Sequence, residues 1–324
     1  MHDVAALAGV SAITVSRVVN SPSKVAPATR ARVEAAIERL GYVPNLTAGS
    51  LASRRTRIIG AIVPTIANSI FAETIQGLSE GLATAGYQLM LGQSGYEDAR
   101  EDALVAAFVG RRVDGLVLTG VGHSRRTRRQ LLNAAVPVVE TWELTRQPID
   151  MVVGFSNFEA GAAMGRHLLS RGWRRLAFVG GSDERSVARG DGLLQAARAA
   201  RAPAPARRII DGATTLAAGR DAIAQLMRGE RPPQAVFFSN DVLAAGALLE
   251  CAARGWSVPD QVAVAGLGDF ELAAQLSPAL TTVRIPMRAI GESAARLLLD
   301  RLSGVEPQSA TVDVGFEIVV RGSA

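Results

Sequence analysis

The chain has 324 residues, more than a single typical globular core holds, and this length suggests about two large units and a small extra one. Hydrophobic residues make up 48% of it and charged residues 20%, a balance that excludes a disordered chain and is typical of a packed α/β protein. No apolar run approaches the roughly 18 to 20 residues of a membrane span, and a single cysteine, Cys251, excludes an intrachain disulfide. We therefore expect a soluble cytoplasmic protein in which Cys251 is a buried helix residue.

The excess positive charge lies at the N-terminal end of the chain. Residues 1–57 hold eight basic and three acidic side chains, a balance of +5 that equals the net charge of the whole chain. The rest of the chain therefore sums to zero. This asymmetry favours an N-terminal module for a polyanion, and the alternative is a merely solvated basic tail.

Apolar residues recur at helical spacing over this segment, which a solvated tail would not show. They predict three short amphipathic helices, the first ended by Gly9, the second capped by Ser11 and the third ended by Gly41. This is the spacing of a helix-turn-helix. At about 100° per residue, the second helix has one face with Val15 and Val18 and an opposite face made of Ala12, Ile13, Ser16, Arg17 and Asn20.

Four strings of this segment match one known pattern, and they are Asp3-Val4-Ala5, Ala8-Gly9-Val10-Ser11, Thr14-Val15-Ser16-Arg17-Val18-Val19-Asn20 and Gly41-Tyr42-Val43-Pro44-Asn45. Through them the sequence resembles the lactose-repressor (LacI/GalR) family of bacterial transcription regulators. The family usually has several residues before the first of these strings, among them a cap for the first helix. Either the start is misassigned, or we expect the first helix to be poorly anchored.

The resemblance implies that the second helix enters the major groove of operator DNA. Ala12, Ile13 and Arg17 then lie nearest the bases, where Arg17 can bind a guanine bidentately and the two apolar side chains can contact a thymine methyl. The other predicted DNA-binding residues of this segment are Ser11, Thr14, Ser16, Asn20 and Lys24.

A short linker follows Pro44, which keeps the residue before it out of helical geometry. A helix of about two turns is unstable alone, and Gly49 weakens this one by a further ~1 kcal/mol relative to alanine. In the family, such a hinge helix folds in the minor groove beside that of a second subunit, and Leu51 matches the leucine that wedges between base steps. The matching residues, which we predict to bind DNA, are Asn45, Ala48, Leu51 and Ala52. The alternative is a flexible tether without base contacts.

From Ile58 onward short apolar runs alternate with helix-length segments, which predicts repeated βα units and two doubly wound parallel sheets. Breaks near Phe155 and Arg284 fit a chain that crosses between two lobes, as in the type I periplasmic-binding-protein fold that the family carries as its sensor. The predicted strands are 58–63, 89–91, 115–119, 151–155, 176–180, 208–211, 235–239 and 262–266.

The predicted architecture is thus α/β: a three-helix helix-turn-helix headpiece with a hinge helix, followed by a two-lobed sensor of doubly wound parallel sheets. The expected domains are the headpiece at 1–44, the hinge helix and linker at 45–57, and the effector-binding and dimerisation domain at 58–324. The expected lobes of the last are about 58–155 with 285–316, and about 156–284 with 317–324.

A cleft between the lobes should be lined by loops at the carboxyl ends of the strands. These loops follow Pro64, Thr119, Thr141, Gly181, Ser239 and Gly266. The histidines His2, His123 and His167 have no metal-ligand spacing, and the chain has no phosphate-binding loop or nucleophile elbow. We therefore expect a protein that is not an enzyme and that holds no metal or cofactor.

The resemblance also places effector contacts on single residues. Arg189, in an Arg-x-x-Gly string that ends at Gly192, matches the arginine that binds the ligand from the second lobe. The alternative is a solvated helix arginine, as we expect for the neighbouring residues Arg185, Arg198 and Arg201. The other predicted effector-binding residues are Asn68, Ser69 and Phe71 of the first lobe and Asn240, Asp241 and Asp269 of the second.

One departure from the family concerns the effector. The usual tyrosine-aspartate pair appears here as Leu267-Gly268, with Asp269 one step later. Loss of a carboxylate from that position removes an acceptor for sugar hydroxyls and also removes repulsion against an anion. The strings 139–142, 153–157 and 266–270 look most like the gluconate-operon repressors of the family. A sugar acid such as gluconate is therefore the expected effector.

Three function classes compete: a ligand-responsive DNA-binding repressor, a free carbohydrate-binding protein and a sugar-modifying enzyme. A transport-type binding protein would carry a signal peptide and no helix-turn-helix, and an enzyme would show a catalytic constellation, so the sequence favours a regulator of carbohydrate or sugar-acid metabolism. The arginine run 125–129 is better explained as a solvated helix face than as a second nucleic-acid site. No leucine heptad follows Arg321, so the expected assembly is a homodimer.

Overall fold

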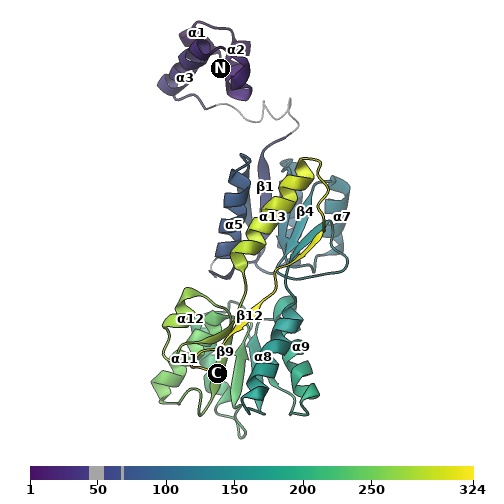
Figure 1. Cartoon of the computed structure of the whole chain (residues 1–324), viewed down its shortest axis with the longest axis vertical. Coiled ribbons are helices and arrows are strands. Elements are labelled where there is room, and N and C mark those ends of the chain that lie inside the picture. The colour runs from purple at the N-terminus through teal and green to yellow at the C-terminus, as the bar shows by residue number, and fades with distance from the viewer. Residues whose placement is uncertain (44–54, 67–68) are drawn as a thin grey trace. The chain divides into compact units, whose positions relative to one another are not determined.

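The computed structural model describes residues 1–43, 55–66 and 69–324. The chain divides into two compact units, Met1–Thr56 and Arg57–Ala324, whose elements are labelled in Figure 1. Within the described ranges, no single helix is long and apolar enough to cross a membrane.

In its described residues the N-terminal unit consists of short helices joined by tight turns, and these are α1 (His2–Ala8), α2 (Ala12–Asn20), the 3₁₀ helix η1 (Pro22–Lys24) and α3 (Pro27–Leu40). Gly9 and Gly41 follow α1 and α3 in the left-handed region, with φ of 65° and 56°, which glycine adopts without steric cost. The Ser11 hydroxyl accepts a hydrogen bond from the Thr14 N–H at 3.2 Å and so caps α2. These helix ends confirm the predicted helix-turn-helix.

A small aliphatic core holds α1, α2 and α3 together. Val4 of α1, Val15 of α2 and Val33 of α3 are fully buried and pack in one cluster. Val18 joins them because residues three apart share one face of a helix. The valine face predicted for α2 is therefore the face that packs against the other helices.

The C-terminal unit contains two six-stranded sheets, in the orders β11-β5-β4-β3-β1-β2 and β12-β10-β9-β8-β6-β7. The strands of the first sheet are β1 (Ile58–Val63), β2 (Gln88–Gln93), β3 (Gly115–Thr119), β4 (Val138–Thr141), β5 (Met151–Gly154) and β11 (Thr311–Asp313). Those of the second are β6 (Leu176–Gly180), β7 (Ala206–Ile209), β8 (Ala235–Phe238), β9 (Ala263–Gly268), β10 (Thr281–Arg284) and β12 (Glu317–Val319). Neighbouring strands in these sheets run parallel, except that β12 runs antiparallel to β10.

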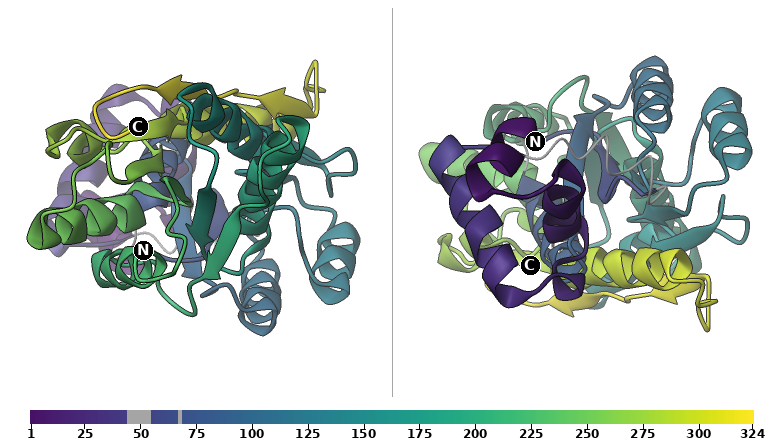
Figure 2. Two further views of the ribbon diagram at one scale, coloured as in Figure 1. Left: turned by 90° about the horizontal axis from the view of Figure 1, so that it is seen from below. Right: turned by 90° about the horizontal axis from the view of Figure 1, so that it is seen from above.

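Helices flank the sheets in both lobes (Figure 2). In the first lobe they are η2 (Ser69–Phe71), α5 (Ala72–Ala83), α6 (Asp98–Gly110), α7 (Arg125–Ala134) and α13 (Met287–Leu302). In the second they are α8 (Asn157–Ser170), α9 (Glu184–Ala199), α10 (Leu216–Leu226), α11 (Asp241–Arg254) and α12 (Glu271–Gln275). The central strands β5, β6, β8 and β9 are buried along their whole length, as parallel strands covered on both faces must be. The predicted fold class is confirmed.

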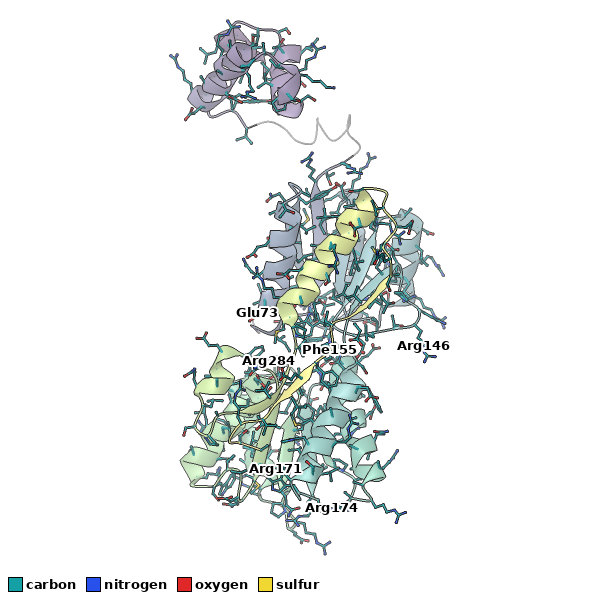
Figure 3. All side chains as sticks on the ribbon, in the orientation of Figure 1. Glu73, Arg146, Phe155, Arg171, Arg174 and Arg284 are labelled. Carbon is teal, nitrogen blue, oxygen red and sulfur yellow. The ribbon has the colours of Figure 1, made fainter. Side chains whose placement is uncertain are left out.

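The chain passes between the lobes beside Phe155 and Arg284, which Figure 3 shows at the level where the lobes meet. A third crossing joins β11 of the first sheet to β12 of the second. Phe155 packs edge-on against Trp142, with ring centroids 6.3 Å apart, and against Phe316 of the third crossing at 6.5 Å. An aromatic cluster therefore joins two of the crossings.

Three pairs of helices approach so closely that glycine is required at the contact. A Cβ at Gly161 of α8 would lie 2.0 Å from the Arg189 carbonyl oxygen, and one at Gly192 of α9 would lie 2.0 Å from the Phe158 carbonyl oxygen. Both distances are far inside van der Waals contact, so each helix presents a glycine to the backbone of the other. The same arrangement joins the pairs α5–α13 and α10–α11 through Gly77, Gly291, Gly219 and Gly246.

Several strands differ from the sequence-based list. The strand predicted at 208–211 is β7, Ala206–Ile209, an exposed edge strand whose residues give no apolar pattern. The list also omitted β4, β10, β11 and β12. Each of these strands has only three or four residues, too few for a periodic pattern to stand out.

Candidate DNA-binding and effector sites

The face of α2 opposite its buried valines is exposed. Ile13 is 66% exposed and Arg17 is exposed beside it, whereas Val15 and Val18 are buried. Ala12, Thr14 and Ser16 are half-buried, and Lys24 is exposed in η1. The exposed face therefore carries the longest of the side chains that were expected nearest the bases.

Some predicted site residues lie outside the part of the chain that the structure describes, and for two others only the position in a helix can be given. Asn45, Ala48, Leu51, Ala52 and Asn68 lie outside the described residues. Asn20 is the last residue of α2, and Ser69 is the first residue of η2.

A cleft of about 1060 Å³ opens between the two lobes at the carboxyl ends of their strands. Of the loops that the sequence placed there, those after Pro64, Thr119, Thr141 and Gly181 contribute to its walls, whereas the loop after Gly266 does not and the segment after Ser239 contributes only Val242. Two further segments also line it, residues 93–98 from the end of β2 to the start of α6 and residues 212–217 between β7 and the first turn of α10, and the sequence reasoning missed them. The turn residues Ser94 and Gly95, shortly after the apolar run 89–91, were a signal that could have found the first.

Arg189 is buried inside the second lobe, 5% exposed, and is not among the residues that line the cleft. Its Nε donates to Asn157 Oδ1 at 2.7 Å, and its Nη1 donates to the Ser239 carbonyl oxygen at 2.7 Å. Burial lowers the pKa of the guanidinium to about 10, which still leaves it charged at neutral pH. The alternative of a solvated arginine is therefore wrong. In this structure, however, the side chain is hydrogen-bonded to other residues of the protein and does not face the cleft.

The neighbouring polar pair is also engaged in the fold. Asn240 Oδ1 accepts a hydrogen bond from the Leu243 N–H at 3.0 Å and so caps α11. Asp241 accepts from the Thr282 hydroxyl at 2.5 Å and from the Phe270 N–H at 3.0 Å. Burial raises the pKa of this carboxyl to about 6. Asp241 thus joins the end of β9 to β10 beneath the cleft.

Asp269 lies at a lobe crossing rather than on the cleft wall. It has a φ of 55° and pairs with Arg284 at 2.7 Å and with Arg321 at 2.6 Å. Arg284 ends β10 and Arg321 follows β12, so one carboxylate joins the end of β10 to the segment after β12. These ion pairs occupy the oxygens that we expected to meet an effector.

Part of each unit matches a known protein family or domain. Residues 1–45 match the family described as bacterial regulatory proteins, lacI family, and residues 166–324 match the periplasmic binding protein-like domain. The chain is also 36% identical to the HTH-type transcriptional regulator GntR of Pseudomonas aeruginosa, in an alignment that covers 100% of this chain and 95% of that protein. The chain belongs to the LacI family.

Two solved structures agree with this membership. A LacI-family regulator from Silicibacter pomeroyi has a TM-score of 0.93 at 32% identity, covering 99% of this chain and 98% of that one. The lac repressor dimer bound to operator has a TM-score of 0.87 at 25% identity, covering 99% and 97%. This LacI-family chain is a DNA-binding transcriptional repressor with a sugar-type effector-binding domain, and its relatives are regulators rather than enzymes.

The position of Arg185 differs from the sequence-based prediction for this LacI-family sensor. We expected a solvated side chain, but Arg185 is 8% exposed and lines the cleft. Its guanidinium lies over the ring of Phe71, 5.7 Å from the centroid, and Phe71 itself is buried against Trp142. The pattern of α9 could not reveal this, because the burial comes from the other lobe.

A buried ionisable cluster lies behind the first-lobe wall. The side chain of His123 is fully buried, with Nδ1 2.7 Å from Glu101 Oε1 and Nε2 3.5 Å from Glu140 Oε1. Burial lowers the pKa of His123, but the hydrogen bond to Glu101 and the charges of Glu101 and Glu140 outweigh burial, so the net shift is upward. Burial raises the pKa of Glu140. Among the described residues, no group of His, Cys, Asp and Glu side chains could hold a metal ion.

Two further predictions concern Cys251 and the arginine run of α7. Cys251 is buried in α11, and burial raises the pKa of its thiol to about 11, as expected for an unreactive cysteine. In the arginine run of α7, Arg125, Arg126 and Arg129 are exposed as predicted. Arg128 differs, because it is half-buried and lies 3.9 Å from Glu140.

Proposed function

We propose that this LacI-family member represses genes of carbohydrate or sugar-acid metabolism and that a sugar acid such as gluconate, bound between the lobes, controls its affinity for operator DNA. The observation that carries the proposal is the large cleft between two lobes in a chain that also presents an exposed helix-turn-helix face. Ligands of doubly wound sheets bind at this end of the strands. The strings 139–142, 153–157 and 266–270, typical of gluconate-operon repressors, and the relatives named GntR support a sugar acid as the effector.

The domains that we assign to this function are the headpiece at 1–44, the hinge helix and linker at 45–57, and the effector-binding and dimerisation domain at 58–324. Its two lobes are about 58–155 with 285–316, and about 156–284 with 317–324. The dimeric lac repressor on its operator supports a homodimer that acts on DNA in the cytoplasm. In that assembly Arg17 and Ile13 meet the bases, and the hinge residues Leu51 and Asn45 meet the minor groove.

A binding experiment on the full chain tests the proposal. An operator is first selected from a random DNA library, and its affinity is then measured by fluorescence anisotropy with and without gluconate, glucose, ribose and cellobiose. We expect gluconate to change the operator affinity and to raise the thermal midpoint, because a ligand at 100 times its Kd adds about 2.7 kcal/mol of stability. If no DNA sequence is selected from the library, the proposed role as a regulator is wrong. If only neutral sugars change the operator affinity, the proposed sugar-acid effector is wrong.

A further inference from the structure

Arginines gather at the amino ends of three neighbouring strands of the second sheet. The strands β8, β6 and β7 lie side by side in this order, and the loops that lead into them are residues 227–234, 171–175 and 200–205. These loops hold one acidic residue, Glu230, and six exposed arginines, which we call the arginine surface: Arg171, Arg174, Arg175, Arg201, Arg228 and Arg231. The cleft lies at the carboxyl ends of the strands, so the arginine surface is at the opposite end of the lobe, where Figure 3 shows Arg171 and Arg174.

Hydrogen bonds hold the three loops together. Arg174 Nη2 donates to the Arg201 carbonyl oxygen at 3.0 Å. Arg175 Nε donates to the Pro232 carbonyl oxygen at 3.1 Å. The backbone N–H groups of Arg174 and Arg175 both donate to Gln234 Oε1, at 2.9 and 3.0 Å. The loops before the three strands therefore form one connected surface.

The positive charge of this surface has no counter-charge within the lobe. Elsewhere in the lobe arginines pair with carboxylates: Arg207 lies 2.5 Å from Asp191. Arg220 and Arg254 share Glu250, at 2.8 and 2.5 Å. Across the part of the chain that the structure describes, none of the six residues of the arginine surface forms an ion pair. Because residues 58–324 together carry no net charge, the arginine surface is a local excess in a neutral domain.

The composition of the arginine surface favours DNA over a protein partner. Protein–protein interfaces have a core rich in apolar and aromatic side chains, but no exposed large hydrophobic side chain of the described chain lies in these three loops. Trp173 is half-buried, and the Arg171 guanidinium lies over its ring, 6.0 Å from the centroid. Protein–DNA interfaces are polar and strongly positive, and a guanidinium binds phosphate oxygens through two hydrogen bonds.

We propose that the arginine surface binds the phosphate backbone of a DNA duplex, at a site separate from the helix-turn-helix. A repressor held on its operator by the headpiece can then hold a second DNA segment. Contacts to phosphates carry no sequence information, so any duplex serves as the second segment. This inference uses the DNA-binding activity of the family and does not depend on which effector the cleft binds.

A two-step binding experiment on the full-length protein tests the inference by biolayer interferometry. Immobilised operator is first loaded with repressor to saturation, and the loaded surface is then moved into a solution of a short duplex that lacks the operator. We expect the loaded surface to bind this duplex and bare operator not to bind it. The affinity of the second step should fall by up to about 1000-fold between about 50 and 200 mM salt, the change that six phosphate contacts produce.

A triple variant separates the arginine surface from general positive charge. Arg201→Gln, Arg228→Gln and Arg231→Gln together should weaken the second step by about 10-fold or more and lower its salt slope by about 3. Among the described residues these three side chains have no hydrogen-bond or ion-pair partner, so the fold does not depend on them. The matched control removes the same charge from α7, by replacing the exposed residues Arg125, Arg126 and Arg129 with glutamine, and should leave the second step unchanged.

Three results would show that the arginine surface is not a DNA site. These are a loaded surface that does not bind the duplex, a second step that salt does not weaken, and equal losses in the two triple variants. Vesicles of phosphatidylglycerol replace the duplex in a parallel run, and binding of vesicles without binding of the duplex would assign the surface to a membrane and overturn the proposal. Operator binding is the folding check for each variant, and the salt dependence of the unaltered protein decides without any variant.

Discussion

Arg189 Nε donates to Asn157 Oδ1 across 2.7 Å, and this bond joins α9 to the first turn of α8. Asn157 in turn donates from Nδ2 to the Trp142 carbonyl oxygen at 2.8 Å, which belongs to the first lobe. With the bond from Arg189 Nη1 to the Ser239 carbonyl oxygen, the arginine links three elements of the second lobe and, through Asn157, the first. Arg189, which the family resemblance predicts to bind the effector, therefore has a structural role in this structure.

We predict that Arg189→Met lowers the free energy of unfolding by about 2 to 4 kcal/mol, because two buried acceptors lose their charged donor. The midpoint of urea unfolding, followed by circular dichroism, measures the change. Arg198→Met changes an exposed residue of the same helix and should stay within about 0.5 kcal/mol of the unaltered protein. Equal stability of the two variants would contradict the structural role.

The close helix pairs lead to a second prediction. Gly161→Ala and Gly192→Ala should each destabilise the protein by about 1 to 3 kcal/mol or more, because a new Cβ would lie 2.0 Å from a carbonyl oxygen of the facing helix. Gly110 at the end of α6 is the matched control, since a Cβ there meets nothing within 4 Å. Gly110→Ala should stabilise the protein by up to ~1 kcal/mol, the difference in helix propensity. Urea midpoints that move in the same direction for all three variants would refute the steric argument.

The cluster around His123 leads to a prediction about pH. The pKa of His123 is raised in the folded protein, so the folded state holds this proton more tightly than the unfolded chain does. The stability that it contributes is fully present below the unfolded pKa of about 6.5 and is lost as the pH rises through the folded value. The raised pKa of Glu140 acts in the same direction, because it too favours a proton in the folded state.

The unaltered protein should therefore lose stability relative to His123→Gln as the pH rises above about 6.5, the pKa of an unfolded histidine. Urea unfolding at intervals of half a pH unit measures the two profiles. His167→Gln is a useful control, because burial lowers the pKa of His167 and the sign of its contribution is opposite. Parallel profiles for the unaltered protein and His123→Gln would show that the cluster does not take up a proton on folding.

The headpiece was predictable from sequence because its signals are local. Ser11 and the two left-handed glycines Gly9 and Gly41 mark helix ends by chemistry within a few residues, and the valines of α2 mark its buried face. The central strands were predictable for a related reason. Strands buried on both faces give continuous apolar runs, which an edge strand such as β7 does not.

The effector site was less predictable because it is made by contacts between residues far apart in the chain. Arg185 is buried by Phe71 and Gly120 of the other lobe, and nothing in the sequence of α9 distinguishes it from the exposed Arg198. The ion pairs of Asp269 with Arg284 and Arg321 likewise depend on how the ends of β9, β10 and β12 meet. Local pattern cannot report such partners.

The last prediction concerns the exposed face of α2. Arg17→Ala should lose discrimination at one base pair of each operator half-site, worth about 1 to 3 kcal/mol, because the guanidinium can bind a guanine through two hydrogen bonds. Anisotropy with the selected operator, its single-base variants and scrambled DNA measures the ratio of affinities.

Arg39→Ala is the matched control, since Arg39 is exposed in the last turn of α3 and carries the same charge outside the α2 face. We expect its removal to weaken binding to selected and scrambled DNA alike and to lower the salt dependence, as the loss of a contact with the phosphate backbone does. Arg17→Ala must instead change the ratio between the two DNAs. If both variants keep the ratio of the unaltered protein, then Arg17 binds phosphate rather than a base, and the specificity of α2 has to come from Ile13 and its neighbours.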